Sequence, residues 1–141
     1  MGINPRWFVQ DYPPAIQAMV PPKTVEERRL GTVWGLPFLL LLLAGPLWST
    51  WGLHRQLGAA SSFLALFGNA AGIALVFNVV DWLVLDWLLF CTWTPRFMVI
   101  PGSEGSPAYK DYAFHFRGFL IGCLFSGIGG LAIAALVWLA A

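Results

Sequence analysis

The sequence predicts an all-α membrane protein with three transmembrane helices, at about residues 33–53, 59–93 and 118–140. The first observation is composition: 58% of the 141 residues are hydrophobic and 11% are charged, whereas a soluble domain has about 25% charged residues. The second is the presence of apolar runs that reach the roughly 20 residues needed to cross a bilayer. The third is the unequal distribution of basic residues between the segments that join these runs.

Residues 1–30 precede the first apolar run and predict an extended arm. Prolines at positions 13, 14, 21 and 22 interrupt the segment, and it has no apolar stretch of the kind that a secretory signal requires. Near its end, Thr24 and Glu27 have the spacing of a capping box, which predicts a helix that begins there and continues into the first span.

The first span, at about 33–53, is "VWGLPFLLLLLAGPLWSTWGL". About 21 residues at ~1.5 Å each give ~31 Å, which matches a hydrocarbon core of ~30 Å. Trp34 stands near one end and Trp48 and Trp51 near the other, as is typical of aromatic residues at membrane interfaces.

The second run, 59–93, admits two interpretations. About 35 residues would form a helix of ~52 Å, which is long enough to span the bilayer with a tilt and to protrude beyond it. The alternative is four spans, with a turn near 78–81 that divides the run in two. The run lacks turn residues in its middle, which favours the single long helix.

The distribution of basic residues also favours three spans. In that topology seven basic residues share one side against Arg55 alone; they are Arg6, Lys23, Arg28, Arg29, Arg96, Lys110 and Arg117. Four spans would divide the eight basic residues equally. The positive-inside rule therefore places the N-terminus in the cytoplasm and the C-terminus outside.

The chain from 94 to 117 predicts a cytoplasmic loop and then an interfacial helical segment at 107–117, with which the last helix starts before it becomes the third span. Pro95 ends the long helix, and Ser106 and Pro107 predict the N-cap and first residue of a new helix. The third span follows at about 118–140. All 141 residues are expected to form a single transmembrane domain.

Two acids stand in the apolar stretch "FNVVDWLVLDWLLF". A carboxylate at the centre of a bilayer costs ~2.5–3.5 kcal/mol, so Asp81 and Asp86 must be paired, hydrated or protonated. In an α-helix, residues five apart point ~140° from one another, so the two acids are expected to meet different neighbours. Asp111 and His115 are four apart and share a helix face.

These polar residues define a candidate cluster for protons, cations or a ligand. Its members are Asp81, Asp86, Asn78, His115, Asp111, Arg96 and Arg117. One interpretation is structural, with the acids anchoring the loop to the long helix. The other is a proton or cation path, or a polar pocket for a ligand headgroup, and it includes a relay between His115 and Asp86.

Small residues recur every fourth position along the third span. The stripe comprises Gly118, Gly122, Ser126, Gly130 and Ala134, and Gly68 with Gly72 forms a second small pair in the long helix. Such stripes let helices approach closely in lipid. The partner is either a helix of the same chain or a second subunit.

The segment "DWLVLDWLLFCTWTPRFMVIPGSEG…YKDYAFHFRGF", from Asp81 to Phe119, resembles a family of small, uncharacterised bacterial integral membrane proteins. The resemblance implies a bacterial cytoplasmic (inner) membrane and attaches no activity.

The sequence therefore predicts a small membrane protein without classical enzyme chemistry, working as a homo-oligomer or with partner membrane subunits. A proton-coupled transport or ion-conducting role is the first hypothesis. The alternatives are an accessory subunit that holds a lipid, quinone or pigment, and a lipid-modifying membrane enzyme. The expected partners are membrane lipids; no nucleic-acid site, metal site or cofactor motif is evident.

Overall fold

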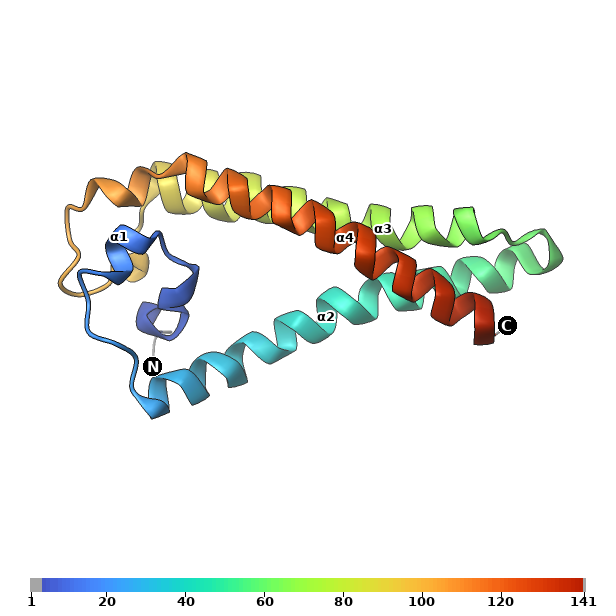
Figure 1. The fold of residues 1–141 in the computed structure, drawn as a ribbon, viewed down its shortest axis with the longest axis horizontal. Coiled ribbons are helices and arrows are strands. Elements are labelled where there is room, and N and C mark those ends of the chain that lie inside the picture. The colour runs from blue at the N-terminus through green and yellow to red at the C-terminus, as the bar shows by residue number, and fades with distance from the viewer. Residues whose placement is uncertain (1–3, 141) are drawn as a thin grey trace. The chain divides into compact units, whose positions relative to one another are not determined.

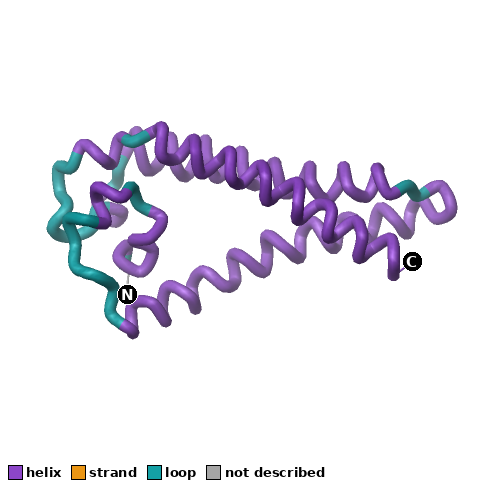
Figure 2. Tube along the Cα trace, in the orientation of Figure 1, coloured by secondary structure: helices purple, strands orange, loops and turns teal. Residues whose placement is uncertain are grey.

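A computed structural model describes residues 4–140, which form helices joined by loops, with no strand among them (Figures 1 and 2). The three long helical stretches are α2 (Val25–Leu57), α3 (Phe63–Val80) with η3 (Asp81–Trp93), and α4 (Tyr112–Ala140). Each stretch is long and apolar enough to cross a membrane. The prediction of an all-α protein with three candidate spans is confirmed.

Short helices occupy the segments between and before the long ones. They are η1 (Pro5–Asp11), α1 (Pro14–Gln17), η2 (Gly58–Ala60), η4 (Arg96–Met98) and η5 (Pro107–Lys110). The first two lie in the N-terminal arm, so the expectation of an extended arm is wrong over these residues. Residues 1–3 of the expected arm lie outside the described residues.

The predicted capping box begins α2. The Glu27 backbone N–H donates to Thr24 Oγ1 at 3.1 Å, and the Thr24 N–H donates to Glu27 Oε2 at 2.9 Å. These reciprocal bonds satisfy two donors that the first turn of a helix leaves without partners. The helix therefore starts at Val25, well before the apolar run.

The second long helix begins at Phe63 rather than at residue 59. Gly58 has φ +52°, and Ser62 is extended, with a side chain that accepts the Ala65 N–H at 3.2 Å. At Asp81 the backbone is helical, with φ −55° and ψ −54°. The chain does not reverse near 78–81, so the four-span alternative is wrong.

The third long helix begins at Tyr112, so the expectation that the last helix starts at residue 107 is wrong. A short helix, η5, ends at Lys110, and the carboxylate of Asp111 accepts the Phe114 N–H at 2.9 Å. Asp111 therefore works as an N-cap. Residues 112–117 belong to α4, and only 107–110 form a separate helix.

The described chain groups into two compact units. The arm-and-loop unit comprises Met1–Pro37 and Trp82–Arg117, and the helical unit comprises Phe38–Asp81 and Gly118–Ala141. The expectation of a single domain stays a prediction. Each unit is described by itself below.

In the helical unit α3 and α4 lie side by side (Figure 1). Leu66 of α3 packs with Ala134 and Val137 of α4, and all three are buried. A methyl group built on Gly130 would lie 2.6 Å from Ala71 Cβ and 2.8 Å from Ala71 Cα. The absence of a side chain at Gly130 is what allows the two backbones to come this close.

The small-residue stripe of α4 is thus used within the chain. Gly122 faces the Asn78 side chain, and Ser126 and Ala134 are buried. By contrast, added methyl groups at Gly68, Gly72 and Gly118 would meet nothing within 4 Å. The part of the stripe from Gly122 to Ala134 is therefore covered by α3, and the contacts between subunits of an oligomer would have to form on another face.

We predict that Gly130→Ala destabilises the protein by about 1–3 kcal/mol, the usual cost of overpacking. The added methyl group meets the Ala71 backbone, which has no flexible atoms to move aside. Thermal unfolding in mild detergent measures the effect. Gly127→Ala is the matched control: nothing lies within 4 Å of that position, so the better helix propensity of alanine makes it neutral or stabilising. Equal effects of the two substitutions would contradict the close α3–α4 contact.

Candidate functional site

The 13 residues of η3 form a π-helix. Such helices have i→i+5 hydrogen bonds and are mostly found as single turns, often at functional sites. The same spacing continues one residue past its end, because the Thr94 N–H donates to Leu89 O at 2.9 Å.

The wider turn brings residues five apart onto one face. Trp82 and Trp87 meet edge to face, with ring centroids 4.7 Å apart, a contact that the ~100° step of an α-helix would prevent. The same spacing separates Asp81 from Asp86. The expected angle of ~140° between these acids assumed an α-helix, and the helix from Asp81 to Trp93 has π geometry instead.

Asp86 pairs with His115 of α4. The distance between Asp86 Oδ1 and His115 Nδ1 is 3.0 Å, and the side chains are 28% and 5% exposed, respectively. A carboxylate only accepts hydrogen bonds, so in this pair Nδ1 carries the proton and donates it. The sequence analysis named these two residues as a relay, and the structure brings them together.

The second ring nitrogen of His115 differs from the first. Nε2 is buried and has no hydrogen-bond partner among the described residues. With the proton on Nδ1, Nε2 is a hydrogen-bond acceptor inside the protein. Aromatic rings flank the imidazole, with centroids at 4.8 Å for Phe90 and 5.2 Å for Phe114. A buried polar atom of this kind is costly unless something binds to it.

The N-terminal arm covers the loop beside this pair. Tyr12, Ile16 and Val20 are buried in one cluster with Phe90 and Tyr109. The Tyr12 ring meets the Phe90 ring edge to face at 4.9 Å. These contacts hold the Phe90 ring in place, and this ring lies against the imidazole of His115.

The hydroxyl of Tyr109 organises the loop. It accepts the Ile100 N–H at 2.9 Å and donates to Ser103 Oγ at 2.7 Å, while Ser103 Oγ donates to Ile100 O at 2.8 Å. The Tyr12 hydroxyl donates to Met98 O at 2.8 Å. The buried polar atoms of the turn are satisfied by this closed network, as a folded interior requires.

Lys110 covers the C-terminal end of η3. Its ammonium donates to Thr92 O at 2.8 Å and to Thr94 Oγ1 at 3.0 Å. Thr94 has φ +51°, an unusual conformation for a β-branched residue. A cation at this position compensates the free carbonyls of a helix end, so Lys110 is engaged with the backbone.

The other predicted site residues lie outside the Asp86–His115 pair. Asp111 caps α4 and does not pair with His115, because it lies before the first turn. Arg96 and Arg117 are exposed, and no ion pair joins either of them to an acid in the described residues. In the helical unit, Asp81 is half-buried and Asn78 donates to Phe119 O at 3.0 Å.

Sequence reasoning missed the five-residue spacing. The stretch from 81 to 90 reads DWLVL followed by DWLLF, a repeat whose period matches the π-helix. It also missed Asp11 of the arm. Partial desolvation is the largest cause that raises the pKa of Asp11, and the Asp86 charge raises it further, while Lys23 and the Gln10 amide lower it.

No group of three or more His, Cys, Asp or Glu side chains in residues 4–140 is placed to hold a metal ion. Comparison with protein families, with curated proteins and with solved structures finds no match to this chain.

We predict that Tyr109→Phe lowers the free energy of unfolding by about 1–3 kcal/mol, because it leaves the buried Ile100 N–H without an acceptor. Thermal unfolding in detergent measures the loss. Tyr112→Phe is the control: that hydroxyl makes one exposed bond, to Thr92 Oγ1, and its removal should cost less. A larger loss for Tyr112→Phe would contradict the role given to Tyr109.

We also predict a pH dependence of arm docking that involves Asp11. The folded pKa of Asp11 lies above its ordinary value of 3.8. Asp11 therefore contributes its full stabilisation of the folded arm below pH 3.8, and this contribution is lost as the pH rises through the folded pKa. Hydrogen exchange of residues 12–20, corrected for the intrinsic rate, should show more protection at pH 4 than at pH 7. Asp11→Asn should reduce this difference slightly, since the side chain is exposed, and Glu26→Gln should leave it unchanged. An unaltered pH dependence in Asp11→Asn would exclude the role of Asp11.

Proposed function

We propose that the chain is an integral membrane protein in which the Asp86–His115 pair takes up a proton and passes it on, as the coupling element of a transport or ion-conducting process. The observation that carries the proposal is that the two nitrogens of the His115 imidazole have different surroundings. Nδ1 faces a carboxylate that solvent reaches, whereas Nε2 is buried and has no hydrogen-bond partner in the part of the chain that the structure describes. An imidazole in such a position can receive a proton on one nitrogen and release one from the other.

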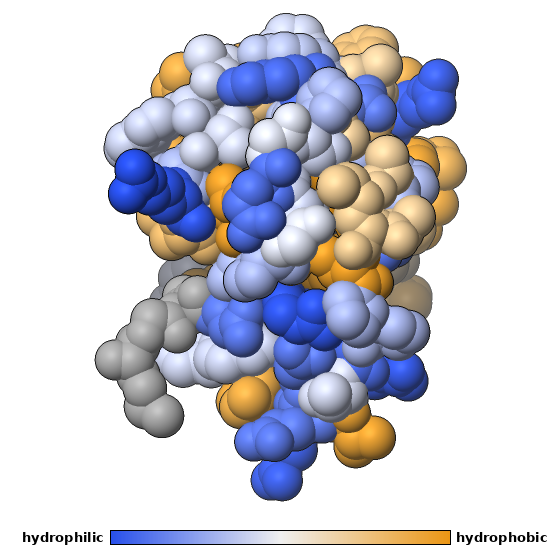
Figure 3. All heavy atoms as spheres, turned by 90° about the vertical axis from the view of Figure 1, so that its left-hand side faces the viewer, coloured by the Kyte–Doolittle hydropathy of each residue, from blue (hydrophilic) through white to orange (hydrophobic). Residues whose placement is uncertain are grey.

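The distribution of apolar surface supports a membrane location. Large apolar side chains of α2, such as Phe38, Leu40 and Leu41, are more than half exposed. The face of the arm-and-loop unit in Figure 3 instead shows many hydrophilic side chains between apolar patches. Lipid tails or the apolar helices of partner subunits would cover the first kind of surface, and headgroups and water the second.

The contacts of the arm support the proposed orientation. Tyr12 bonds directly to the loop at Met98, so the arm and the loop lie on one side of a membrane crossed by the three candidate spans. This side carries seven of the eight basic residues, and the positive-inside rule makes it cytoplasmic. The proton site would then face the cytoplasm, and the membrane would be the inner membrane of a bacterium.

A second candidate function is a subunit that holds a quinone. The buried Nε2 is an acceptor between the rings of Phe90 and Phe114, and a quinol hydroxyl would donate to it while its ring packs against the aromatic side chains. This function predicts a bound redox-active lipid rather than a proton flux.

The test is proton flux in reconstituted vesicles loaded with a pH-sensitive dye, under an imposed potential. Asp86→Asn and His115→Gln should each slow the flux by about 10²-fold or more, the range for loss of a positioned proton-transfer group. Glu26→Gln, which removes an exposed carboxylate of α2, should match the wild type. Equal flux in all four proteins, or flux no faster than in empty vesicles, would refute the transport role. A quinone that copurifies with the wild type and is lost in His115→Gln would favour the second candidate.

A further inference from the structure

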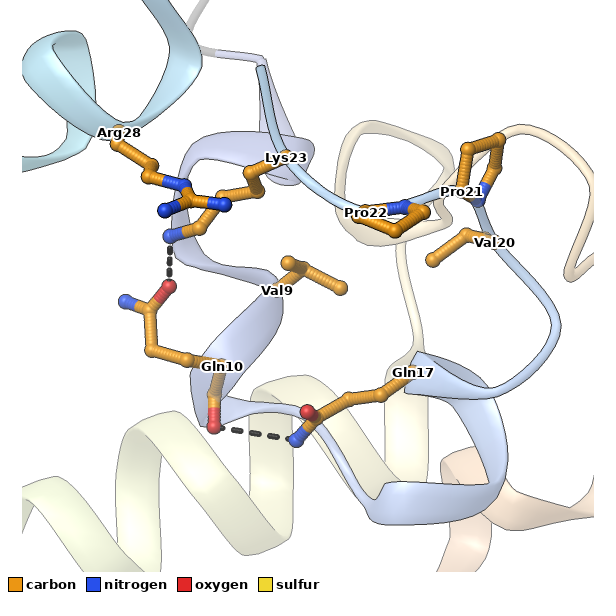
Figure 4. A pocket seen from close by; sticks show the side chains of 8 residues that line it. All are labelled: Val9, Gln10, Gln17, Val20, Pro21, Pro22, Lys23 and Arg28. Carbon is orange, nitrogen blue, oxygen red and sulfur yellow. Dashed lines mark hydrogen bonds between the residues drawn. The ribbon is translucent and has the colours of Figure 1, made fainter. Parts of the chain in front are cut away.

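A cavity of about 300 Å³ lies in the arm-and-loop unit, apart from the Asp86–His115 pair. Its walls are formed by η1, α1, the chain that leads into α2 and the first turn of α2. The lining residues are Val9, Gln10, Gln17, Val20, Pro21, Pro22, Lys23 and Arg28 (Figure 4). Its volume is at the lower end of the range of ligand sites, which is about 300–1,000 Å³. It is therefore large enough for a small polar headgroup.

Two cationic side chains line this cavity. In the view of Figure 4, Lys23 and Arg28 lie on one side, and Val20, Pro21 and Pro22 lie on the other. The cavity thus combines positive charge with an apolar wall. No carboxylate is among its lining residues.

The charged residues next to Arg28 bind other groups, so the Arg28 guanidinium is available to bind a ligand. Glu27, the adjacent acid, is bound by Arg6, with distances of 2.6 and 3.2 Å from Arg6 Nε and Nη2 to the two carboxylate oxygens. Lys23 donates to Trp7 O at 2.9 Å and to the Gln10 side-chain oxygen, and the charge of Asp11 reaches it. The Arg28 side chain is exposed and has no hydrogen-bond acceptor or ion-pair partner in the described residues.

From this arrangement we infer that the cavity binds a phosphate group, supplied by an anionic lipid headgroup or by free phosphate. A guanidinium offers parallel N–H donors that match two phosphate oxygens, and the Lys23 ammonium adds a second positive charge. The Gln17 amide donates to Gln10 O and Tyr12 O and so joins α1 to η1, two of the elements that line the cavity. The arm would in this way carry a recognition site that is separate from the proton site.

The position of Arg28 along α2 suits a lipid source. Arg28 precedes the predicted apolar span at residue 33 by five residues, or about 8 Å of helix. Basic residues just cytoplasmic of a span lie at the level of the lipid phosphates, where each contributes about 1 kcal/mol of attraction to anionic lipid. The apolar wall of Val20, Pro21 and Pro22 would face the glycerol part of such a lipid.

The test is native mass spectrometry of the full-length protein in mild detergent, titrated with phosphatidylglycerol or with phosphatidylcholine. We expect the wild type to bind phosphatidylglycerol, and Arg28→Gln to bind it about fivefold more weakly, as expected for one basic residue. Arg28→Lys should be intermediate, because it keeps the charge and loses the paired donors. Arg29→Gln is the matched control, since it removes an exposed neighbouring charge that does not line the cavity. Circular dichroism would verify that all variants keep their helical content.

Inorganic phosphate at millimolar concentration identifies the source of the group. If it displaces phosphatidylglycerol from the wild type, the cavity takes free phosphate as well; if it does not, the cavity requires the lipid. Both results support a phosphate site. The inference is overturned if Arg28→Gln and Arg29→Gln weaken binding equally, which would indicate diffuse surface charge, or if the wild type binds neither phosphatidylglycerol nor phosphate.

Discussion

The change from α to π geometry at Asp81 is the constraint on which the candidate site depends. An α-helix would turn Trp87 away from Trp82, whereas the i→i+5 spacing aligns the two rings. The same register turns Asp86 toward His115 and Phe90 toward the arm. The hydrogen-bond geometry of a π-helix is less favourable than that of an α-helix. The Trp82–Trp87 contact and the Asp86–His115 pair, which this register makes possible, must offset that cost.

The arm and the loop stabilise the end of this helix from outside. Three arm side chains, Tyr12, Ile16 and Val20, are buried against it, and full burial of such a side chain contributes about 1.5–3 kcal/mol. Lys110 compensates the carbonyl end of η3, where Thr94 adopts its strained backbone conformation. Neither set of contacts is local in sequence. The long π-helix is therefore a product of tertiary packing rather than of helix propensity.

Structural features that depend on residues close in sequence could be predicted, and features that depend on contacts between distant residues could not. The Thr24–Glu27 capping box and the Ser106 cap were predictable because each joins residues two or three apart. The three candidate spans were predictable because length and polarity alone determine them. The docking of Tyr12 onto Met98 joins residues 86 positions apart, and no pattern in one sequence encodes it. The π-helix lies between these cases, because the repeat DWLVL–DWLLF is visible but was interpreted with a period of 3.6.

The polar side chains of the helical unit have their hydrogen bonds within that unit. In the helical unit Asn69 donates to Ser49 and Thr50, Asn78 to Phe119 O, and Ser126 to Gly122 O. These bonds satisfy polar groups inside an apolar bundle, where an unpaired group is costly, and they give those side chains a structural role. In the arm-and-loop unit the buried Nε2 of His115 and the exposed Arg28 keep unused bonding capacity. A site that receives protons or anions needs such unused capacity, and the proton site and the phosphate site that we propose both lie in the arm-and-loop unit.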